Sequence, residues 1–213
     1  MGIAERRGRE REARRGAVLD AARSLLMERG ITGTTTKLIA ERCELSEATL
    51  FFYFQSKEEI LFSLLFEGID FWARGLDKLI ALRLPREKLL ARLWKYFLEV
   101  REQHPEYFLL STYLSYPRAS ADVAEEVKAE LVRRSGENFA RLTRLLEQAL
   151  GAPNGRLAAD LLWASFLGLV TLRDARINLG SRAHPTDREM TNSLRTLAAG
   201  LLATADTRAG GKK

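Results

Sequence analysis

The sequence predicts an all-α fold, with a small N-terminal domain followed by a larger C-terminal helical domain. Apolar residues recur at helical spacing through most of the 213 residues, and no stretch has the sustained alternation of a β-strand. All five prolines fall between these periodic segments, where several suit the first position of a helix. We expect domains at residues 1–56 and 57–205, and a disordered polar tail at 206–213.

The first predicted helix begins near Arg11 and ends at Gly30. Its apolar stripe consists of Ala17, Val18, Ala21, Ala22, Leu25 and Leu26. Glycine at position 30 suits the left-handed residue that often terminates a helix. Residues 1–15 contain six arginines and three glutamates, and we interpret them as a solvated, frayed helix start.

Residues 34–57 predict two short helices joined by a tight turn. The first helix has one apolar face, made of Thr36, Ile39, Ala40 and Cys43, with Thr35 as its N-cap. Ser46 is a second N-cap candidate, so another helix begins only about three residues after the first one ends. A link of this length makes the helices cross steeply, as in a helix-turn-helix, which lays its second helix in the DNA major groove.

The outer side of the second helix carries side chains that suit DNA recognition. Ala48 and Phe52 could meet thymine methyl groups, and Glu47 could accept a hydrogen bond from cytosine N4. Residues at the margins would hold phosphates, and the arginines of residues 1–15 offer an alternative arm along the phosphates or into a minor groove. The predicted DNA-binding set is Thr34, Thr35, Lys37, Ser46, Glu47, Ala48, Thr49, Phe51, Phe52, Tyr53 and Lys57.

These residues resemble the TetR family of bacterial one-component regulators over about the first third of the chain. The matching motifs are Thr34-Thr35, Ile39-Ala40, Ser46, Thr49-Leu50-Phe51-Phe52-Tyr53-Phe54 and Ser56-Lys57-Glu58, the last of which also opens a capping box. Two positions depart from the family pattern. Glu44 replaces the usual glycine of the turn, which costs about 1 kcal/mol if the residue is left-handed. Glu47-Ala48 replaces a small glycine near the start of the second helix.

The resemblance implies a ligand-responsive transcriptional regulator, a repressor, that binds a palindromic operator in double-stranded DNA as a homodimer. A small hydrophobic or amphipathic effector in the C-terminal domain would release it. Two alternatives stay open from the residues alone. One is a helical small-molecule-binding protein or enzyme without DNA-binding activity. The other is a DNA-binding protein whose C-terminal domain acts through a protein partner.

The C-terminal half predicts further helices at 57–80, 85–103, 105–116, 120–150, 155–179 and 186–203. Large rings from successive helices could enclose an effector cavity, although ordinary core packing also accounts for each of them. The candidate effector-binding residues are Phe62, Phe66, Trp72, Trp94, Phe97, Tyr107, Phe108 and Tyr113.

The last two predicted helices are apolar on more than one side, so each must be buried on more than one side. A homodimeric four-helix seam would satisfy this requirement, and an internal core would satisfy it equally well. The candidate dimerisation residues are Leu161, Phe166, Leu169, Leu194, Leu197 and Leu201.

Several other kinds of protein lack support in the sequence. The net charge is +6, but residues 1–60 hold eleven basic and ten acidic residues, so charge alone does not predict nucleic-acid binding. Two histidines and a single cysteine give no recognisable metal or nucleophile spacing, so we expect no enzyme activity, metal or cofactor. No apolar stretch reaches the length of a membrane span, and one cysteine fits a reducing compartment, so we expect a cytoplasmic protein.

Overall fold

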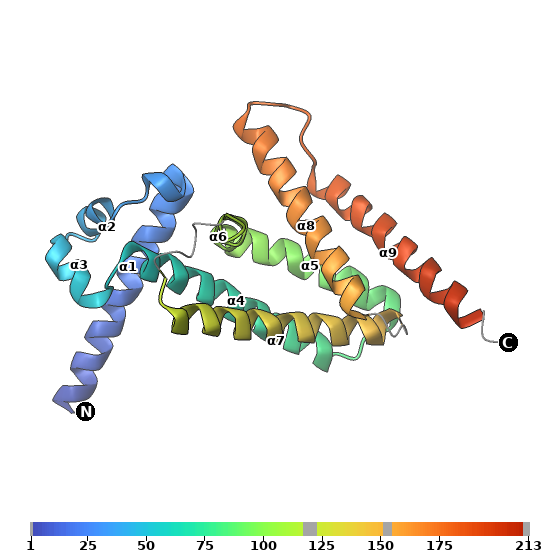
Figure 1. Cartoon of the computed structure of the whole chain (residues 1–213), viewed down its shortest axis with the longest axis horizontal. Helices are drawn as coiled ribbons and strands as arrows, with labels where there is room; N and C mark the ends of the chain where they lie inside the picture. Colours follow the sequence, from blue (N-terminus) through green and yellow to red (C-terminus); the bar gives the residue numbers. More distant parts are fainter. Residues whose placement is uncertain (1, 117–122, 151–154, 211–213) are drawn as a thin grey trace. The chain divides into compact units, whose positions relative to one another are not determined.

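The computed structural model describes residues 2–116, 123–150 and 155–210, and within these ranges the chain forms helices and no strand (Figure 1). The all-α prediction is therefore confirmed. The first helices are α1 (Ile3–Gly33), α2 (Thr36–Arg42), α3 (Glu47–Tyr53) and α4 (Lys57–Ala81). They are followed by α5 (Arg86–Gln103), α6 (Pro105–Tyr113), α7 (Glu125–Leu150), α8 (Gly155–Asn178) and α9 (Asp187–Gly210).

Three helix bounds differ most from the predicted ones, and the others agree to within three residues. α1 begins at Ile3, so the arginine-rich segment is already helical. α7 begins at Glu125, and the residues 117–122, where an earlier start was predicted, lie outside the described residues. α9 continues to Gly210, within the segment predicted as a tail, and the last three residues lie outside the described part.

The chain divides into two compact units. The first unit comprises Met1–Gly68 and His104–Leu131, and the second comprises Ile69–Gln103 and Val132–Lys213. The first unit therefore includes the start of α4 and all of α6 in addition to α1, α2 and α3. The boundary at residues 56 and 57 stays a prediction for the functional domains.

The core of the first unit follows the apolar stripe of α1. Val18, Ala22 and Leu25 are completely or almost completely buried, as are Ile39 of α2 and Leu50 of α3. α1 has its predicted break at Gly30, where the backbone is left-handed with a φ of 68°. Thr34 closes this end, because its backbone N–H and its hydroxyl both donate to the Gly30 carbonyl.

A charge cluster joins three helices of the first unit. Arg23 of α1 donates to the carboxylate of Glu106 on α6 at 3.0 Å and to that of Glu67 on α4. Glu106 has no exposed surface, and its Oε1 also lies 3.1 Å from the His104 ring nitrogen. A buried carboxylate is stable only when it is paired and hydrogen-bonded, so Arg23 holds these helices together electrostatically.

The second unit is built around a cluster of rings from α4, α5 and α8. The Trp72 ring lies edge-on to Phe97 at 4.6 Å and to Trp163 at 5.5 Å between centroids. Phe166 lies edge-on to Phe97 at 5.0 Å, in an arrangement that aromatic pairs prefer. α9 joins the cluster through Thr191, whose hydroxyl accepts from the Trp94 indole N–H at 3.1 Å.

α8 combines buried and exposed apolar residues. Among the described residues, it is the one helix long and apolar enough to cross a membrane, and 33% of its apolar window is buried within the chain. A core helix or a subunit-interface helix of a globular protein has the same composition, so this single helix is weak evidence for a membrane span. Leu157, Leu161 and Leu172 are exposed on one face of it, and Ile177 is exposed near its C-terminal end on another.

Candidate nucleic-acid interface

The helix-turn-helix forms as its cap residues predict. Thr35 Oγ1 accepts from the backbone N–H of Leu38 at 3.3 Å and starts α2. Ser46 Oγ accepts from the backbone N–H of Thr49 at 3.1 Å and starts α3. Between them Glu44 is left-handed, with a φ of 56°, at the position where the sequence departs from glycine. The turn therefore carries backbone strain that a glycine would remove.

α3 presents a face that its own unit leaves uncovered. Glu47, Ala48 and Thr49 are exposed, as are Phe51 and Phe52, whose relative exposures are 46% and 69%. The opposite face is buried through Leu50, and Phe54 just beyond the helix is buried as well. Two adjacent phenylalanine rings that remain exposed to solvent indicate an interaction surface.

The polar groups of this face already bond to one another. Glu47 Oε1 accepts from the Thr36 hydroxyl of α2 at 2.7 Å, and the hydroxyls of Ser46 and Thr49 lie 2.8 Å apart. These bonds hold the Glu47 carboxylate and the two hydroxyls in place on the exposed side of α3. Lys37 and Thr35 are exposed at the margin, and Tyr53 is half-buried.

Thr34 differs from the prediction. It was included among the DNA-binding residues, but it has no exposed surface, and its hydroxyl donates to the Gly30 carbonyl at 2.8 Å. This bond stabilises the end of α1. Thr34 is therefore a structural residue in this conformation and is not accessible to DNA.

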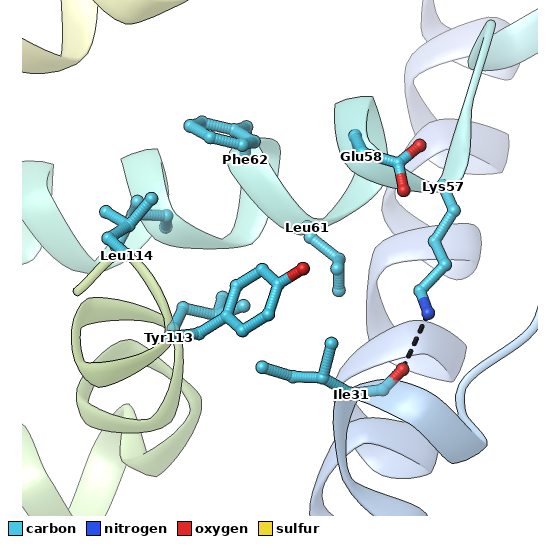
Figure 2. A pocket seen from close by; sticks show the side chains of 9 residues that line it. Ile31, Lys57, Glu58, Leu61, Phe62, Tyr113 and Leu114 are labelled. Atoms are coloured by element: carbon cyan, nitrogen blue, oxygen red, sulfur yellow. Dashed lines mark hydrogen bonds between the residues drawn. The ribbon is translucent and has the colours of Figure 1, made fainter. Parts of the chain in front are cut away.

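Lys57 is the first residue of α4, as predicted, but its side chain has a partner that the sequence did not indicate. Its ammonium donates to the Ile31 carbonyl at 2.6 Å, across a small hollow of about 30 Å³ whose walls include Leu61, Phe62 and Tyr113 (Figure 2). Burial lowers the pKa of the Lys57 ammonium, while the neighbouring carboxylate of Glu58 raises it. The ammonium has three N–H donors, so a phosphate contact could share or replace this hydrogen bond.

α1 supplies two residues that the predicted DNA-binding set does not contain. The Arg11 guanidinium lies over the Phe52 ring at 5.6 Å, and that of Arg15 lies over the Phe54 ring at 4.1 Å. Arg15 also donates to the Tyr53 carbonyl at the end of α3. Their spacing of four residues on one helix was visible in the sequence, but their position beside α3 depends on the packing.

The predicted effector-binding residues fall into separate groups. Phe62 and Tyr113 line the small hollow beside Lys57, and Phe108 is buried in the same unit. Phe66 and Tyr107 are half-buried there. Trp72, Trp94 and Phe97 belong instead to the packed ring cluster of the second unit.

The second unit has two larger hollows. One has a volume of about 480 Å³ and runs between α4 and α5, with Phe71 and Tyr96 as its rings and Arg74, Lys78 and Arg92 as its cations. The other has a volume of about 330 Å³ and lies between α8 and α9, beside Leu169, Leu194 and Leu197. The first hollow is within the size range of small-molecule sites.

The predicted dimerisation residues divide between core and surface. Phe166 and Leu194 are buried within the single chain, with relative exposures of 0% and 7%, so they are core residues and not parts of an exposed face. Leu161 is exposed, and Leu169 and Leu197 are half-buried. Leu201 lies in α9, but its side chain lies outside the described residues.

The described residues also include side chains of the types that bind metal ions or act as nucleophiles. Within residues 2–116, 123–150 and 155–210 there is no group of three or more histidine, cysteine or acidic side chains that could hold a metal ion. Cys43 is half-buried, and burial raises the pKa of its thiol, which disfavours the reactive thiolate.

Comparison with known proteins supports the assignment of the N-terminal region. Residues 18–64 match the sequence profile of the bacterial regulatory proteins of the tetR family. The chain is 48% identical over 48 residues to the HTH-type transcriptional regulator YvkB of Bacillus subtilis, a match that covers 22% of this chain and 25% of that protein. It is 28% identical over 142 residues to the regulator HbdR of Aromatoleum sp., covering 66% of this chain and 58% of that protein.

Neither sequence match spans two thirds of its relative, but the fold is similar over nearly the whole chain. The TetR family transcriptional regulator PfmR of Thermus thermophilus superposes with a TM-score of 0.66 at 18% identity, covering 87% of this chain and 97% of that one. These similar proteins are transcriptional regulators and not enzymes, as the sequence predicts. Residues 18–64 therefore carry the helix-turn-helix sequence of the tetR family of bacterial regulatory proteins, and the fold of the chain is similar to that of a solved TetR family regulator.

Proposed function

We propose that the chain is a transcriptional regulator, a repressor, that binds a palindromic operator as a homodimer and is released by a small amphipathic effector. The observation that carries this proposal is the uncovered face of α3, where Phe51 and Phe52 remain in water beside Glu47 and Ala48. A helix of this composition, held by a second helix across a tight turn, fits the major groove.

Binding to DNA would rearrange the polar groups around α3. Glu47 would exchange the Thr36 hydroxyl for a cytosine amino group, and Lys57 would exchange the Ile31 carbonyl for a phosphate. The lowered pKa of Lys57 shows that burial disfavours its charge. A phosphate would give that charge an anionic partner, and this electrostatic gain favours the exchange.

The exposed apolar side of α8 supports dimerisation. Leu161 and Leu172 have relative exposures of 41% and 42%, and the hollow beside α9 continues this apolar surface at Leu197. A second copy of the chain would bury these leucines and place two α3 helices on one operator.

The hollow between α4 and α5 is the proposed entrance for the effector. Its wall includes Phe71 and Tyr96, which the predicted effector-binding set does not contain, and the Tyr96 ring separates the hollow from Trp72, to which it lies edge-on at 5.4 Å. Arg74 and Lys78 in its wall suit an acidic group on an otherwise apolar molecule, whereas Arg92 already donates to Glu99 at 3.0 Å. The effector would act by preferring the dimer whose α3 helices are wrongly spaced for DNA, with a coupling energy of about 1 to 3 kcal/mol.

The experiment that tests the function is selection of bound sequences from a random DNA library, followed by salt titration of the selected duplex. We expect a symmetric site whose affinity exceeds that for unrelated duplex by at least about a thousandfold. Glu47→Ala should change the preferred bases, whereas Glu41→Ala, an exposed change on α2, should leave them unchanged. Selection that enriches no sequence would overturn the regulator proposal and return the chain to the class of helical ligand-binding proteins.

A further inference from the structure

The N-terminal part of α1 separates its charges onto different faces of the helix. Arg7, Arg11, Arg14 and Arg15 lie at i, i+4, i+7 and i+8, which places all four on one side. The three glutamates of this segment, Glu5, Glu10 and Glu12, fall on the flank and back of the helix. Glu10 is paired with Arg6 at 3.7 Å, and Glu5 accepts from the backbone N–H of Gly2.

This arginine face continues the face that α1 buries further along. Val18, Ala22 and Leu25 follow the arginines at i+11, i+15 and i+18, and each is at most 1% exposed. One side of α1 is therefore apolar where the protein covers it, and basic where the covering helices end. The basic part of this helix face is suited to binding an anionic partner molecule.

The arginine face lies next to α3. The Arg11 guanidinium is 5.6 Å from the Phe52 ring centroid, and Arg15 donates to the Tyr53 carbonyl, so this face and the end of α3 meet. Arg7 lies one turn further out and is exposed. From Arg15 to Arg7 the helix rises about 12 Å, which corresponds to about three or four base pairs.

We infer that this arginine face is a second, sequence-independent DNA contact, which holds the phosphodiester backbone on the flank of the half-site that α3 occupies. Arg7 and Arg11 bind phosphates there, and Arg15 fixes the face against the end of α3. The inference rests on the proposed function for the position of the DNA, and adds a surface outside the helix-turn-helix. Guanidinium groups suit this contact because they bind phosphate through paired N–H donors.

The test compares two double variants of the full-length protein with the same loss of charge. Arg7→Ala/Arg11→Ala removes the arginine face, and Arg6→Ala/Arg9→Ala removes two charges from the other side of the helix. For the first variant we expect the slope of log affinity against log salt to decrease by about two, on operator and on unrelated duplex alike. The second variant should keep the wild-type slope. Trimming the duplex to the half-sites should weaken the wild type and leave the first variant unaffected.

Equal slopes for both double variants would overturn the inference, since only net charge would then matter. The same holds if the first variant keeps the wild-type slope. If the double change disturbs folding, Arg7→Ala alone decides, with an expected decrease in slope of about one. Failure of the proposed function gives a different result, because the wild type would then select no sequence, while the slopes on unrelated duplex still test the arginine face.

Discussion

The two units of the chain place their aromatic rings in opposite ways. In α3 of the first unit, Phe51 and Phe52 have relative exposures of 46% and 69%, whereas Trp72, Phe97 and Phe166 of the second unit are at most 3% exposed. Full burial of a large apolar side chain contributes roughly 1.5 to 3 kcal/mol. The second unit therefore uses its rings for stability, and the first unit leaves rings available for binding.

The first unit adds a buried ion pair to its apolar core. Arg23 is the central group, because it joins α1 to the wholly buried carboxylate of Glu106 and to Glu67. A buried ion pair contributes little compared with apolar packing, yet it is expensive to break. We therefore expect the first unit to be most sensitive to loss of one partner of the ion pair, and the second unit to loss of a buried ring.

The largest expected effect is that of Phe166→Ala, compared with Phe52→Ala. Removing the Phe166 ring from between Trp94 and Phe97 should lower the free energy of unfolding of the second unit by about 3 to 5 kcal/mol. Phe52→Ala should change stability by less than about 0.5 kcal/mol, and should instead weaken operator binding. Denaturant unfolding followed by tryptophan fluorescence measures the Phe166 effect, since all three tryptophans, at 72, 94 and 163, lie in the second unit, and hydrogen exchange in α1 and α3 measures the Phe52 effect in the first unit. Similar losses from both changes would contradict the division of roles.

Breaking the charge cluster should produce the next largest effect. Arg23→Ala leaves the Glu106 carboxylate buried without its guanidinium partner, and we expect a loss of about 3 kcal/mol in the first unit. Far-UV circular dichroism and hydrogen exchange in α1 and α6 measure it. Arg42→Ala is the control, because Arg42 pairs with Glu28 in water, and it should leave the unfolding midpoint nearly unchanged.

A second change distinguishes the ion pair from mere packing. Arg23→Met combined with Glu106→Leu should recover most of the stability lost in the single variant, because the wholly buried Glu106 carboxylate is removed together with its partner. If the double variant is as unstable as Arg23→Ala, the arginine contributes through its shape and not through its charge.

The sequence predicted the features that depend on neighbouring residues. The break at Gly30 and the caps at Thr35 and Ser46 are local, because each side chain bonds to a backbone group at most four residues away. The capping box at Ser56 was predicted for the same reason, and Ser56 Oγ does accept from the Glu59 backbone N–H at 3.1 Å.

The features that the sequence missed depend on distant residues. Lys57 bonds to Ile31, Glu47 to Thr36 and Arg15 to Tyr53, and nothing in the spacing along the chain indicates these partners. Periodicity also cannot distinguish a residue in the core of one chain from a residue in a seam between two chains. Phe166 illustrates this limit, because its helical phase fits both roles and only the packing against Trp94 decides.

A smaller effect of opposite sign is expected at the turn before α3. Glu44→Gly should raise the stability of the first unit by about 1 kcal/mol, because the residue has a φ of 56° and glycine adopts this conformation without strain. Glu41→Gly, at an exposed helical position of α2, should lower stability by a similar amount, about 1 kcal/mol. The pair separates backbone conformation from the loss of a carboxylate. Equal effects of both changes would mean that the turn carries no strain.

The smallest expected effect is a difference in the pH dependence of the two units. In the first unit, burial raises the pKa of Glu67 above its ordinary 4.5, with the neighbouring Arg23 opposing and Glu106 adding to the rise. The folded state then holds this proton more tightly than the unfolded state. The stability that Glu67 contributes is therefore present below pH 4.5 and is lost as the pH rises through the folded pKa.

The second unit contains the opposite case. The backbone N–H and hydroxyl of Thr186 donate to Glu189 and lower the pKa of its carboxyl, so its contribution is present above pH 4.5 and is lost as the pH falls. We expect hydrogen exchange to show that the first unit of the wild type loses stability as the pH rises, and that Glu67→Gln abolishes this loss. The second unit of the wild type should lose stability as the pH falls, and Glu189→Gln should abolish that loss. If stability changes with pH in the same direction in both units, Arg23 outweighs burial and Glu67 remains charged. The charge cluster would then be a net source of stability at neutral pH.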